Sequence, residues 1–247
     1  MNNKEKMIAR FQEVKAMGWV KSRRRNNTGI GKTFEDYVGV DENNIDEPDL
    51  FGFEIKAHRE ESSSYVTLCT KAPTFPKRAN AYLLNSFGSP NEENPMIKRL
   101  HTSMFAEHQN THMGKYAFKL NNNPNTKEVR IEVYDLLTGE LLDNQCGYKY
   151  EVLEKIFAQK LKNLFYVSAE RRFQDDVEEF HYTQADIYLQ PSFRKFLELL
   201  DQGIIMYDIR MGSYQSGKNI GKPHDHGSGF RIKPQDLPLL YAEHETI

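Results

Sequence analysis

The chain has 247 residues, 38% of them hydrophobic and 12% aromatic, which is enough for one large domain or two lobes with a packed interior. The formal net charge of −2 argues against a protein that coats nucleic acid non-specifically, so any DNA contact must come from local clusters. Cys69 and Cys146 lie far apart and indicate reduced thiols. Without a signal-peptide pattern or an apolar run of ~20 residues, we expect a soluble, cytoplasmic protein.

The N-terminal part of the chain predicts an amphipathic helix followed by a loop. Over residues 4–17, apolar side chains recur at helical spacing, among them Met7, Phe11 and Val14. The basic segment KSRRRNNTGIGK that follows is typical of a loop, and a second helix is expected to start near Lys32.

The rest of the chain mixes helices and strands. Two strands are expected at 49–57 and 65–71, paired as a hairpin or meander, whereas residues 73–127 give no clear pattern. An acidic turn is expected at 41–48 and another turn at 61–64. The mixture favours an α/β or α+β fold. Further strands are expected at 129–135, 164–172, 181–189 and 204–211, and helices at 150–163 and 190–203.

One short apolar stretch, PDLFGFEIKAHRE, carries charged residues in its middle. Side chains of a strand alternate between two faces, so Phe53 and Ile55 should face a core while Glu54 and Lys56 project together from the other face. Asp49 stands just ahead of them. Such a set of charges can be a solvated surface pair, which is the commoner use of these residues.

The same residues also suit phosphodiester hydrolysis. A metal ion can polarise the phosphate and activate a water, and magnesium accepts two carboxylates while it keeps several waters. Asp49 and Glu54 can supply the carboxylates, and Lys56 can stabilise charge that develops on the phosphate. Glu35, on the preceding helix, is either a third carboxylate of this site or a plain surface residue.

A second motif, GIGKT, resembles the end of a phosphate-binding P-loop. The complete motif needs a glycine at position 26, where the chain has Asn26, and a strand ahead of it, where the chain has SRRRNN. We therefore expect a loop that leads into a helix, and not an ATPase or GTPase site.

The C-terminal sequence KPHDHGSG places His224 and His226 two residues apart. On a strand they would share one face and could bind a transition metal, but Asp225 would point away from them. Contact with bases or phosphate and a plain surface position are the alternatives. Basic residues that could hold phosphates, or be solvated, cluster at Lys21, Arg23, Arg24, Arg25, Arg171 and Arg172.

Taken together, these motifs resemble the MvaI/BcnI restriction endonucleases, in the MutH-like branch of the PD-(D/E)xK nuclease superfamily. The residues that carry the resemblance are the Asp49-x4-Glu54-x-Lys56 pattern behind a proline, the stretch TGIGKTFE, and the segment YDIRMGSYQSGKNIGKPHDHGSGFRI. The resemblance implies a restriction-endonuclease-like mixed sheet flanked by helices. It also implies magnesium, for which manganese can substitute, with Asp49, Glu54 and Ile55 as ligands, Lys56 as catalytic lysine and Glu35 as an auxiliary carboxylate.

The resemblance further implies a catalytic lobe, expected at about 1–165, and a DNA-recognition lobe, expected at 166–247, which clamp duplex DNA. Family members read CCWGG or CCSGG as monomers, and a cognate DNA methyltransferase is expected in the host. Arginine donates two hydrogen bonds to guanine, and histidine can also donate to it, so base contacts are expected from four residues and further DNA contacts from two. The first group is Arg210, His224, His226 and Arg231, and the second is Lys218 and Arg23.

Two alternatives stay open at this point. A MutH-like nuclease would nick one strand and depend on partner proteins. A DNA-binding module would carry the acidic patch for structural reasons only. Cleavage of both strands without partner proteins would distinguish a restriction endonuclease from the MutH-like nuclease. Dependence of cleavage on magnesium and Lys56 would distinguish it from the DNA-binding module.

Overall fold

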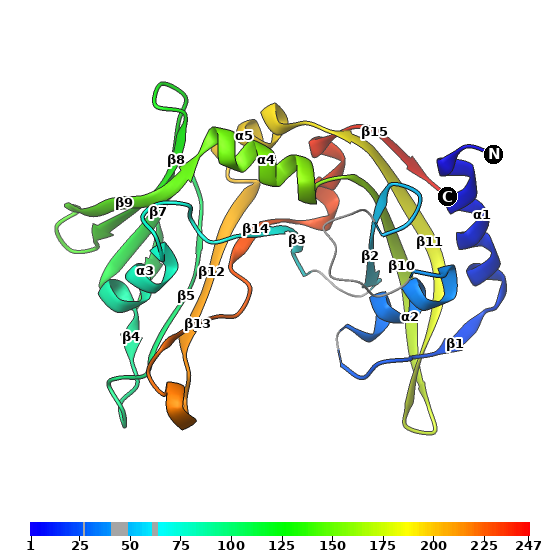
Figure 1. The fold of residues 1–247 in the computed structure, drawn as a ribbon, viewed down its shortest axis with the longest axis horizontal. Coiled ribbons are helices and arrows are strands. Elements are labelled where there is room, and N and C mark those ends of the chain that lie inside the picture. The colour runs from blue at the N-terminus through cyan, green and yellow to red at the C-terminus, as the bar shows by residue number, and fades with distance from the viewer. Residues whose placement is uncertain (27, 41–48, 61–63) are drawn as a thin grey trace. The chain divides into compact units, whose positions relative to one another are not determined.

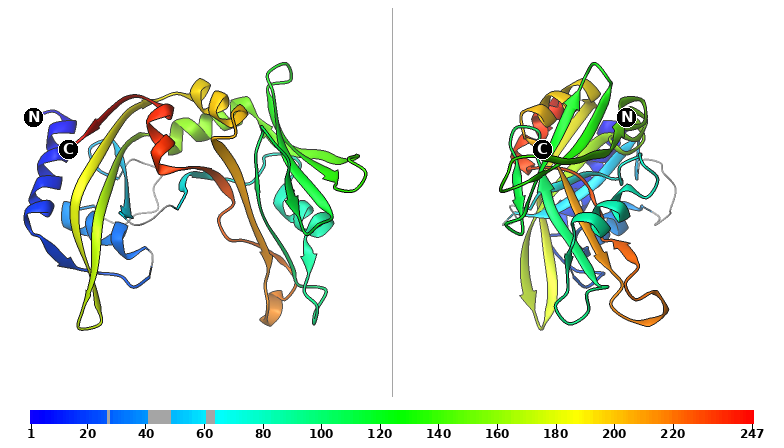
Figure 2. Two further views of the ribbon diagram at one scale, coloured as in Figure 1. Left: turned by 180° about the vertical axis from the view of Figure 1, so that it is seen from behind. Right: turned by 90° about the vertical axis from the view of Figure 1, so that its left-hand side faces the viewer.

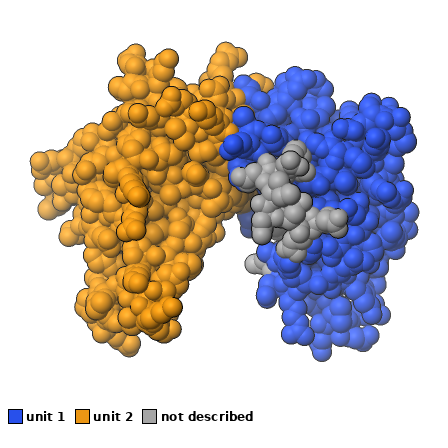
Figure 3. All heavy atoms as spheres, viewed as in Figure 1, with its two compact units in different colours: residues 1–64, 158–192, 238–247 blue, residues 65–157, 193–237 orange. Residues whose placement is uncertain are grey.

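A computed structural model describes residues 1–26, 28–40, 49–60 and 64–247, in two compact units (Figures 1 and 3). Unit 1 consists of residues 1–64, 158–192 and 238–247, and unit 2 of residues 65–157 and 193–237. The units are therefore interleaved along the chain and differ from the continuous segments expected from the sequence. The acidic turn expected at 41–48 and most of the turn expected at 61–64 lie outside the described residues.

Unit 1 is built on a twisted five-stranded sheet. Its order is β1 (Trp19–Lys21), β11 (Val177–Pro191), β10 (Asn163–Gln174) and β2 (Phe53–Arg59), and β15 (Tyr241–Thr246) also pairs with β11. Strands β10 and β11 form a long antiparallel hairpin whose tip projects beyond the rest of the sheet (Figure 2), and β2 runs parallel to β10.

Two helices pack on one face of this sheet (Figure 1). Helix α1 (Asn3–Ala16) begins with a capping box, in which the Asn2 side chain accepts the amide of Glu5 while the Glu5 carboxylate accepts the amide of Asn2. Helix α2 (Gly29–Val38) ends at Gly39. The core between helices and sheet includes Met7, Phe11, Val14, Ile30, Phe34, Phe53, Ile55, Phe165, Val167, Phe180, Tyr182 and Ile187.

Unit 2 contains two further sheets. The six-stranded sheet has the order β3 (Val66–Thr70), β14 (Gly229–Ile232), β12 (Ile205–Ser213), β5 (Lys98–Met104) and β4 (Ser89–Pro90), with β13 (Pro223–Asp225) beside β12. The four-stranded sheet is the meander β6 (Asn110–His112), β7 (Tyr116–Asn123), β8 (Glu128–Asp135) and β9 (Leu141–Lys149). The remaining α-helices are α3 (Ala79–Phe87), α4 (Tyr150–Lys160), which ends in unit 1, and α5 (Phe193–Asp201), and two 3₁₀ helices cover Gly217–Asn219 and Pro234–Leu240.

The mixed helix and strand fold is confirmed, but several local expectations change. The second helix starts at Gly29, so GIGKT lies inside α2 and is not a phosphate-binding loop. The expected strand at 49–57 begins only at Phe53, and it does not pair with β3, which belongs to the sheet of unit 2. Residues 73–127, which gave no pattern, form α3 and β4 to β7.

Both cysteines are buried, and neither forms a disulfide bond. No helix in the described ranges has the length and apolar character needed to cross a membrane.

Candidate active site

A tight turn places Asp49 beside strand β2. The backbone amide of Phe53 donates to the carbonyl of Leu50 at 2.9 Å, and the amide of Leu50 donates back to Phe53 at 3.2 Å. The two residues between them, Phe51 and Gly52, have φ values of 50° and 84°. Positive φ at both central positions is the conformation of a type I′ turn, which is why glycine suits the second position. The chain therefore doubles back, and Asp49 lies alongside the strand.

The turn explains the spacing of the charged residues. The carboxylate of Asp49 accepts the backbone amide of Ile55 at 2.7 Å, so it is fixed next to Glu54. On the face of β2 that points away from the helices, the ammonium of Lys56 lies 3.1 Å from the Glu54 carboxylate. Phe53 and Ile55 are buried at 2% and 4% exposure, as predicted, and anchor the strand to the core. Asp49, Glu54 and Lys56 thus form one charged cluster.

The pKa of Asp49 is raised above its ordinary value. Burial of the carboxyl group is the main cause, and the charge of Glu54 adds to it, while the Ile55 amide and the Lys56 ammonium act in the opposite direction. The surrounding groups therefore do not fully offset the cost of burying the ionised Asp49 carboxylate. A cation bound between the two carboxylates would stabilise that charge.

Glu35 lies on α2, where its charge contributes to the raised pKa of Tyr182. It is not among the groups that shift the pKa of Asp49. Among the described residues, no group of three or more histidine, cysteine or acidic side chains is placed to hold a metal ion. The structure thus brings Asp49 and Glu54 together beside strand β2, while Glu35 stands on α2.

Two carboxylates still fit a magnesium ion, because magnesium keeps several waters and takes only one or two protein carboxylates at such sites. Ile55 donates its amide to Asp49, so its carbonyl oxygen is the atom that could serve as the third expected ligand. The partly exposed side chains of Glu54 and Lys56, each at 31%, leave the cluster open to a substrate.

In unit 2, two of the expected DNA contacts share one carboxylate. Asp208 on β12 accepts a hydrogen bond from Nε of Arg210 at 2.6 Å, and it forms an ion pair with Arg231, whose Nε lies 2.9 Å from the carboxylate. Arg231 is 8% exposed and also donates to Thr67 and to the carbonyl of Gly227, and burial lowers its pKa. The Arg210 side chain is 46% exposed. Arg210 is therefore accessible to a ligand, whereas Arg231 is largely built into the sheet.

The two histidines lie at the edge of the same sheet. Their rings are 4.4 Å apart, and the ring of His226 also approaches His101 on β5 at 6.2 Å. The carboxylate of the exposed Asp225 accepts the Asn80 side chain at 2.7 Å and the amide of Ser228, also at 2.7 Å. The Asp225 carboxylate is engaged by these bonds, and the described residues provide no complete metal site at the histidine pair.

The remaining two expected DNA contacts lie on separate loops. Lys218 is exposed in the short 3₁₀ helix Gly217–Asn219 of unit 2. Arg23 belongs to unit 1, with its guanidinium 4.2 Å from the ring centre of Tyr37 and 3.7 Å from Asp36. Its side chain is 47% exposed, so its outer edge can reach a partner.

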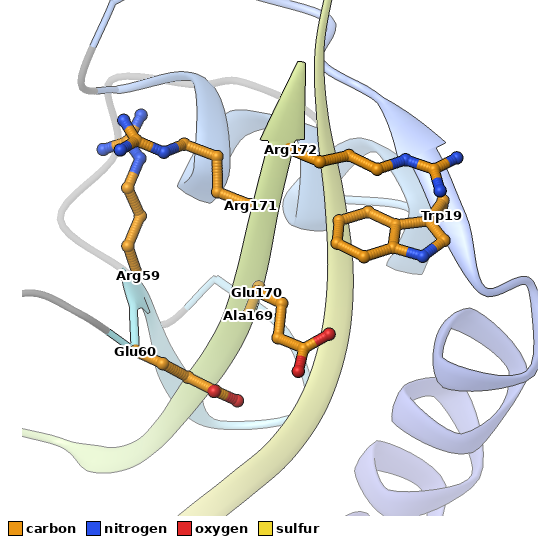
Figure 4. Close-up of a pocket in the computed structure, with 7 residues that line it drawn as sticks. All are labelled: Trp19, Arg59, Glu60, Ala169, Glu170, Arg171 and Arg172. Carbon is orange, nitrogen blue, oxygen red and sulfur yellow. The ribbon is translucent and has the colours of Figure 1, made fainter. Parts of the chain in front are cut away.

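A pocket of about 410 Å³ lies where β2 ends (Figure 4). Figure 4 shows Trp19 beside Arg172 at one side and Arg59 near Arg171 at the other. One arginine on each side has a close carboxylate partner: Arg172 pairs with Glu179 at 2.7 Å and Arg59 with Glu178 at 2.8 Å. The lining residues are Trp19, Arg59, Glu60, Ala169, Glu170, Arg171 and Arg172.

Sequence reasoning missed Asp208, His101 and Arg59. Arg59 lies at the end of the same strand as Lys56, but Asp208 and His101 come from strands whose pairing the sequence did not reveal.

Comparison with known proteins identifies the family. The model of the MvaI/BcnI restriction endonuclease family matches residues 8–241, nearly the whole chain. The chain belongs to this family. It is thus a type II restriction endonuclease, a DNA-cutting hydrolase, and the predicted resemblance is confirmed.

Two solved structures of the MvaI/BcnI family support the assignment. The chain is 33% identical to the protein in a restriction endonuclease MvaI–cognate DNA substrate complex, with a TM-score of 0.85 and coverage of 97% of this chain and 96% of that one. It is also 33% identical to restriction endonuclease MvaI in the absence of DNA, with a TM-score of 0.67 and coverage of 100% and 98%. At this identity the chain is a relative of MvaI and not MvaI itself. A comparison with curated proteins found no match.

Proposed function

We propose that this protein is a magnesium-dependent, site-specific nuclease that cuts both strands of duplex DNA at a short G·C-rich pseudo-palindrome. CCWGG is the favoured site and CCSGG the next. The observation that carries the proposal is the cluster in which Asp49, bonded to the Ile55 amide at 2.7 Å, lies beside Glu54 and Lys56. The DNA substrate in the related MvaI complex supports duplex DNA as the ligand.

Each residue of the cluster has a distinct role in this proposal. Asp49, Glu54 and the carbonyl of Ile55 would hold magnesium, or manganese in its place, and the bound ion would polarise the phosphate and lower the pKa of a water. Lys56 would orient that water and stabilise the charge that develops on the phosphate oxygens. Glu35 is retained as an auxiliary carboxylate that acts from α2.

Unit 2 supplies the base contacts in the same proposal. Arg210, His224 and His226 have accessible side chains, and Arg231 supports the orientation of Arg210 through Asp208 as well as facing the DNA. Lys218 and Arg23 would bind phosphates. We propose that the protein acts as a monomer and that the host protects its own sites with a cognate methyltransferase.

Cleavage of a plasmid tests the proposal. Purified protein is incubated with the plasmid in magnesium, in manganese and in EDTA, beside Asp49→Ala and Lys56→Ala, and the fragment ends are sequenced. We expect discrete fragments that end at one G·C-rich site and that disappear with EDTA and with either substitution.

The other outcomes identify the alternatives. A nicked plasmid that needs added partner proteins for cleavage would favour a MutH-like repair nuclease. An intact plasmid with retained DNA binding would favour a non-catalytic module, in which the acidic cluster serves structure alone.

A further inference from the structure

The catalytic face of β2 carries a third side chain. Alternation along the strand puts Glu54, Lys56 and His58 on the same face, with successive members about 7 Å apart. Lys56 therefore lies between Glu54 on one side and His58 on the other. The Lys56 ammonium contacts Glu54, so the position of His58 decides whether the lysine side chain can rotate away from Glu54 along the strand.

The ring of His58 is held from two sides by the neighbouring strand. It stacks on Tyr166 with ring centres 4.2 Å apart and an angle of 6° between the planes. Its Nε2 lies 3.3 Å from the hydroxyl of Ser168. In the parallel register, Tyr166 is directly opposite Lys56 and Ser168 is directly opposite His58. The contacts join the two strands at the level of the catalytic lysine.

Tyr166 is well placed to keep this arrangement rigid. It is 5% exposed although it lies on the face of the sheet opposite the helices, and it pairs across β10 and β11 with Asp186. The Asp186 carboxylate in turn contacts Nε2 of His244 on β15 at 2.9 Å, so the contacts that begin at Tyr166 extend across the sheet to β15. A ring that is this buried has few alternative rotamers, and it fixes the ring of His58 that stacks on it.

A lysine at this position needs such support. Its four-carbon stem is flexible, and holding it in one geometry costs side-chain conformational entropy. Among the described residues, the contact with Glu54 at 3.1 Å restrains the ammonium. In the proposed reaction Glu54 also binds the metal, so part of its charge is taken up there, and its hold on Lys56 weakens.

We propose that His58 and Tyr166 are positioning residues, whose stacked rings close the space beside Lys56 and direct its ammonium to the metal side of the site. The inference rests on the proposed nuclease function. Burial lowers the pKa of His58, against the smaller opposing effects of the Val167 backbone and of the charges of Asp186 and Glu60. A neutral ring suits this role because an imidazolium beside Lys56 would repel the ammonium.

The test compares His58→Ala with His58→Phe. Alanine opens the space beside Lys56, whereas phenylalanine keeps a flat ring that can stack on Tyr166 but loses the contact with Ser168. The single-turnover cleavage rate, the DNA affinity in EDTA and the magnesium concentration for half-maximal rate are measured for each variant. The control is His181→Ala, which removes a histidine of the same sheet that packs against Trp19 at 5.6 Å.

We expect His58→Ala to lower the cleavage rate about ten- to a hundred-fold, the size that a small misplacement of a catalytic group produces. DNA affinity and magnesium dependence should stay within about three-fold, since neither ligand is lost. His58→Phe should recover most of the rate, and His181→Ala should match the parent protein. Thermal unfolding of each variant separates loss of fold from loss of rate.

Two results would overturn the inference while leaving the nuclease function intact. One is a normal rate for His58→Ala in a preparation where Lys56→Ala is inactive. The other is an equal loss for His58→Ala and His58→Phe, which would assign the imidazole itself a role. If Lys56→Ala cleaves normally, the proposed function fails first.

Discussion

The carboxylate of Asp49 accepts the backbone amide of Ile55, six residues further along the chain, at 2.7 Å. This bond ties a residue in front of the turn to the middle of strand β2, and it holds Asp49 within the electrostatic reach of both Glu54 and Lys56. The position of Asp49 beside the strand is therefore fixed by this bond and by the turn at Phe51 and Gly52.

Asp49→Asn should stabilise the protein in EDTA at pH 7. The pKa of Asp49 is raised in the folded state, so its contribution to stability is present below its ordinary value of 3.8 and is lost as the pH rises through the raised value. At neutral pH the ionised group lowers the free energy of unfolding, and asparagine removes that charge. Thermal unfolding should show a higher Tm for the variant in EDTA and no gain in magnesium.

The gain should shrink as the pH falls towards 3.8, because the parent residue then becomes protonated as well. Asp176→Asn, at the tip of the β10–β11 hairpin with a φ of 59° that asparagine tolerates, is the matched control. A lower Tm for Asp49→Asn in EDTA would show that the bond from Ile55 outweighs the cost of burial.

Arg210→Ala and Arg231→Ala should have different effects, although both arginines bind Asp208. Loss of the exposed Arg210 should weaken binding of the specific site by about 1–3 kcal/mol and leave non-specific binding and Tm nearly unchanged. Loss of the buried Arg231 should weaken specific binding by the same range, and it should also lower Tm by several degrees.

The cost in stability for Arg231→Ala should stay below the roughly 3–5 kcal/mol of a broken buried ion pair, because Asp208 keeps its bond with Arg210. Affinity for specific and random duplexes, measured beside thermal unfolding, checks both variants. Equal loss of affinity on the two duplexes would reassign the arginine concerned to phosphate contact.

Gly212→Ala should displace His226 with little loss of stability. A Cβ atom at position 212 would lie 2.9 Å from Nε2 of His226, the far end of a side chain that can rotate away. Specific binding should then fall as it does for His226→Ala, whereas Tm should change by less than about 2 °C. Normal specific affinity in Gly212→Ala would show that the observed position of His226 is not needed for recognition.

Arg23→Ala should weaken binding to all duplexes alike. A phosphate contact carries no sequence information, and its loss reduces the slope of log affinity against log salt by about one. Arg10→Ala is a suitable control, because Arg10 is an exposed arginine of α1 that pairs with Glu13 at 2.9 Å. An unchanged slope for Arg23→Ala would leave Arg23 with its packing role against Tyr37.

The sequence predicted elements better than it predicted their pairing. Helix α1 and strand β8 follow from apolar spacing, and they lie within one or two residues of the expected ranges. The pairing of β2 with β10 joins segments more than 100 residues apart, which local patterns do not encode. No elements could be predicted in the long segment 73–127, because its short strands alternate with polar turns and show weak periodicity.

The candidate site shows the same limit. Glu54 and Lys56 could be placed on one face from alternation alone, but the turn at Phe51 and Gly52, with positive φ at a phenylalanine, could not be anticipated. Arg231 was expected to face DNA, and its burial against Asp208 depends on three strands that meet only in the folded sheet.

The interleaving of the two units has a consequence for biosynthesis. Strand β15, which pairs with β11 and supplies the partners of Asp186, starts about 185 residues after Lys56. At roughly 5–20 residues per second, a ribosome needs on the order of ten to forty seconds to travel that distance. During this interval the nascent chain carries the acidic cluster on an unfinished sheet, so the last strand of unit 1 sets the moment at which this sheet can close.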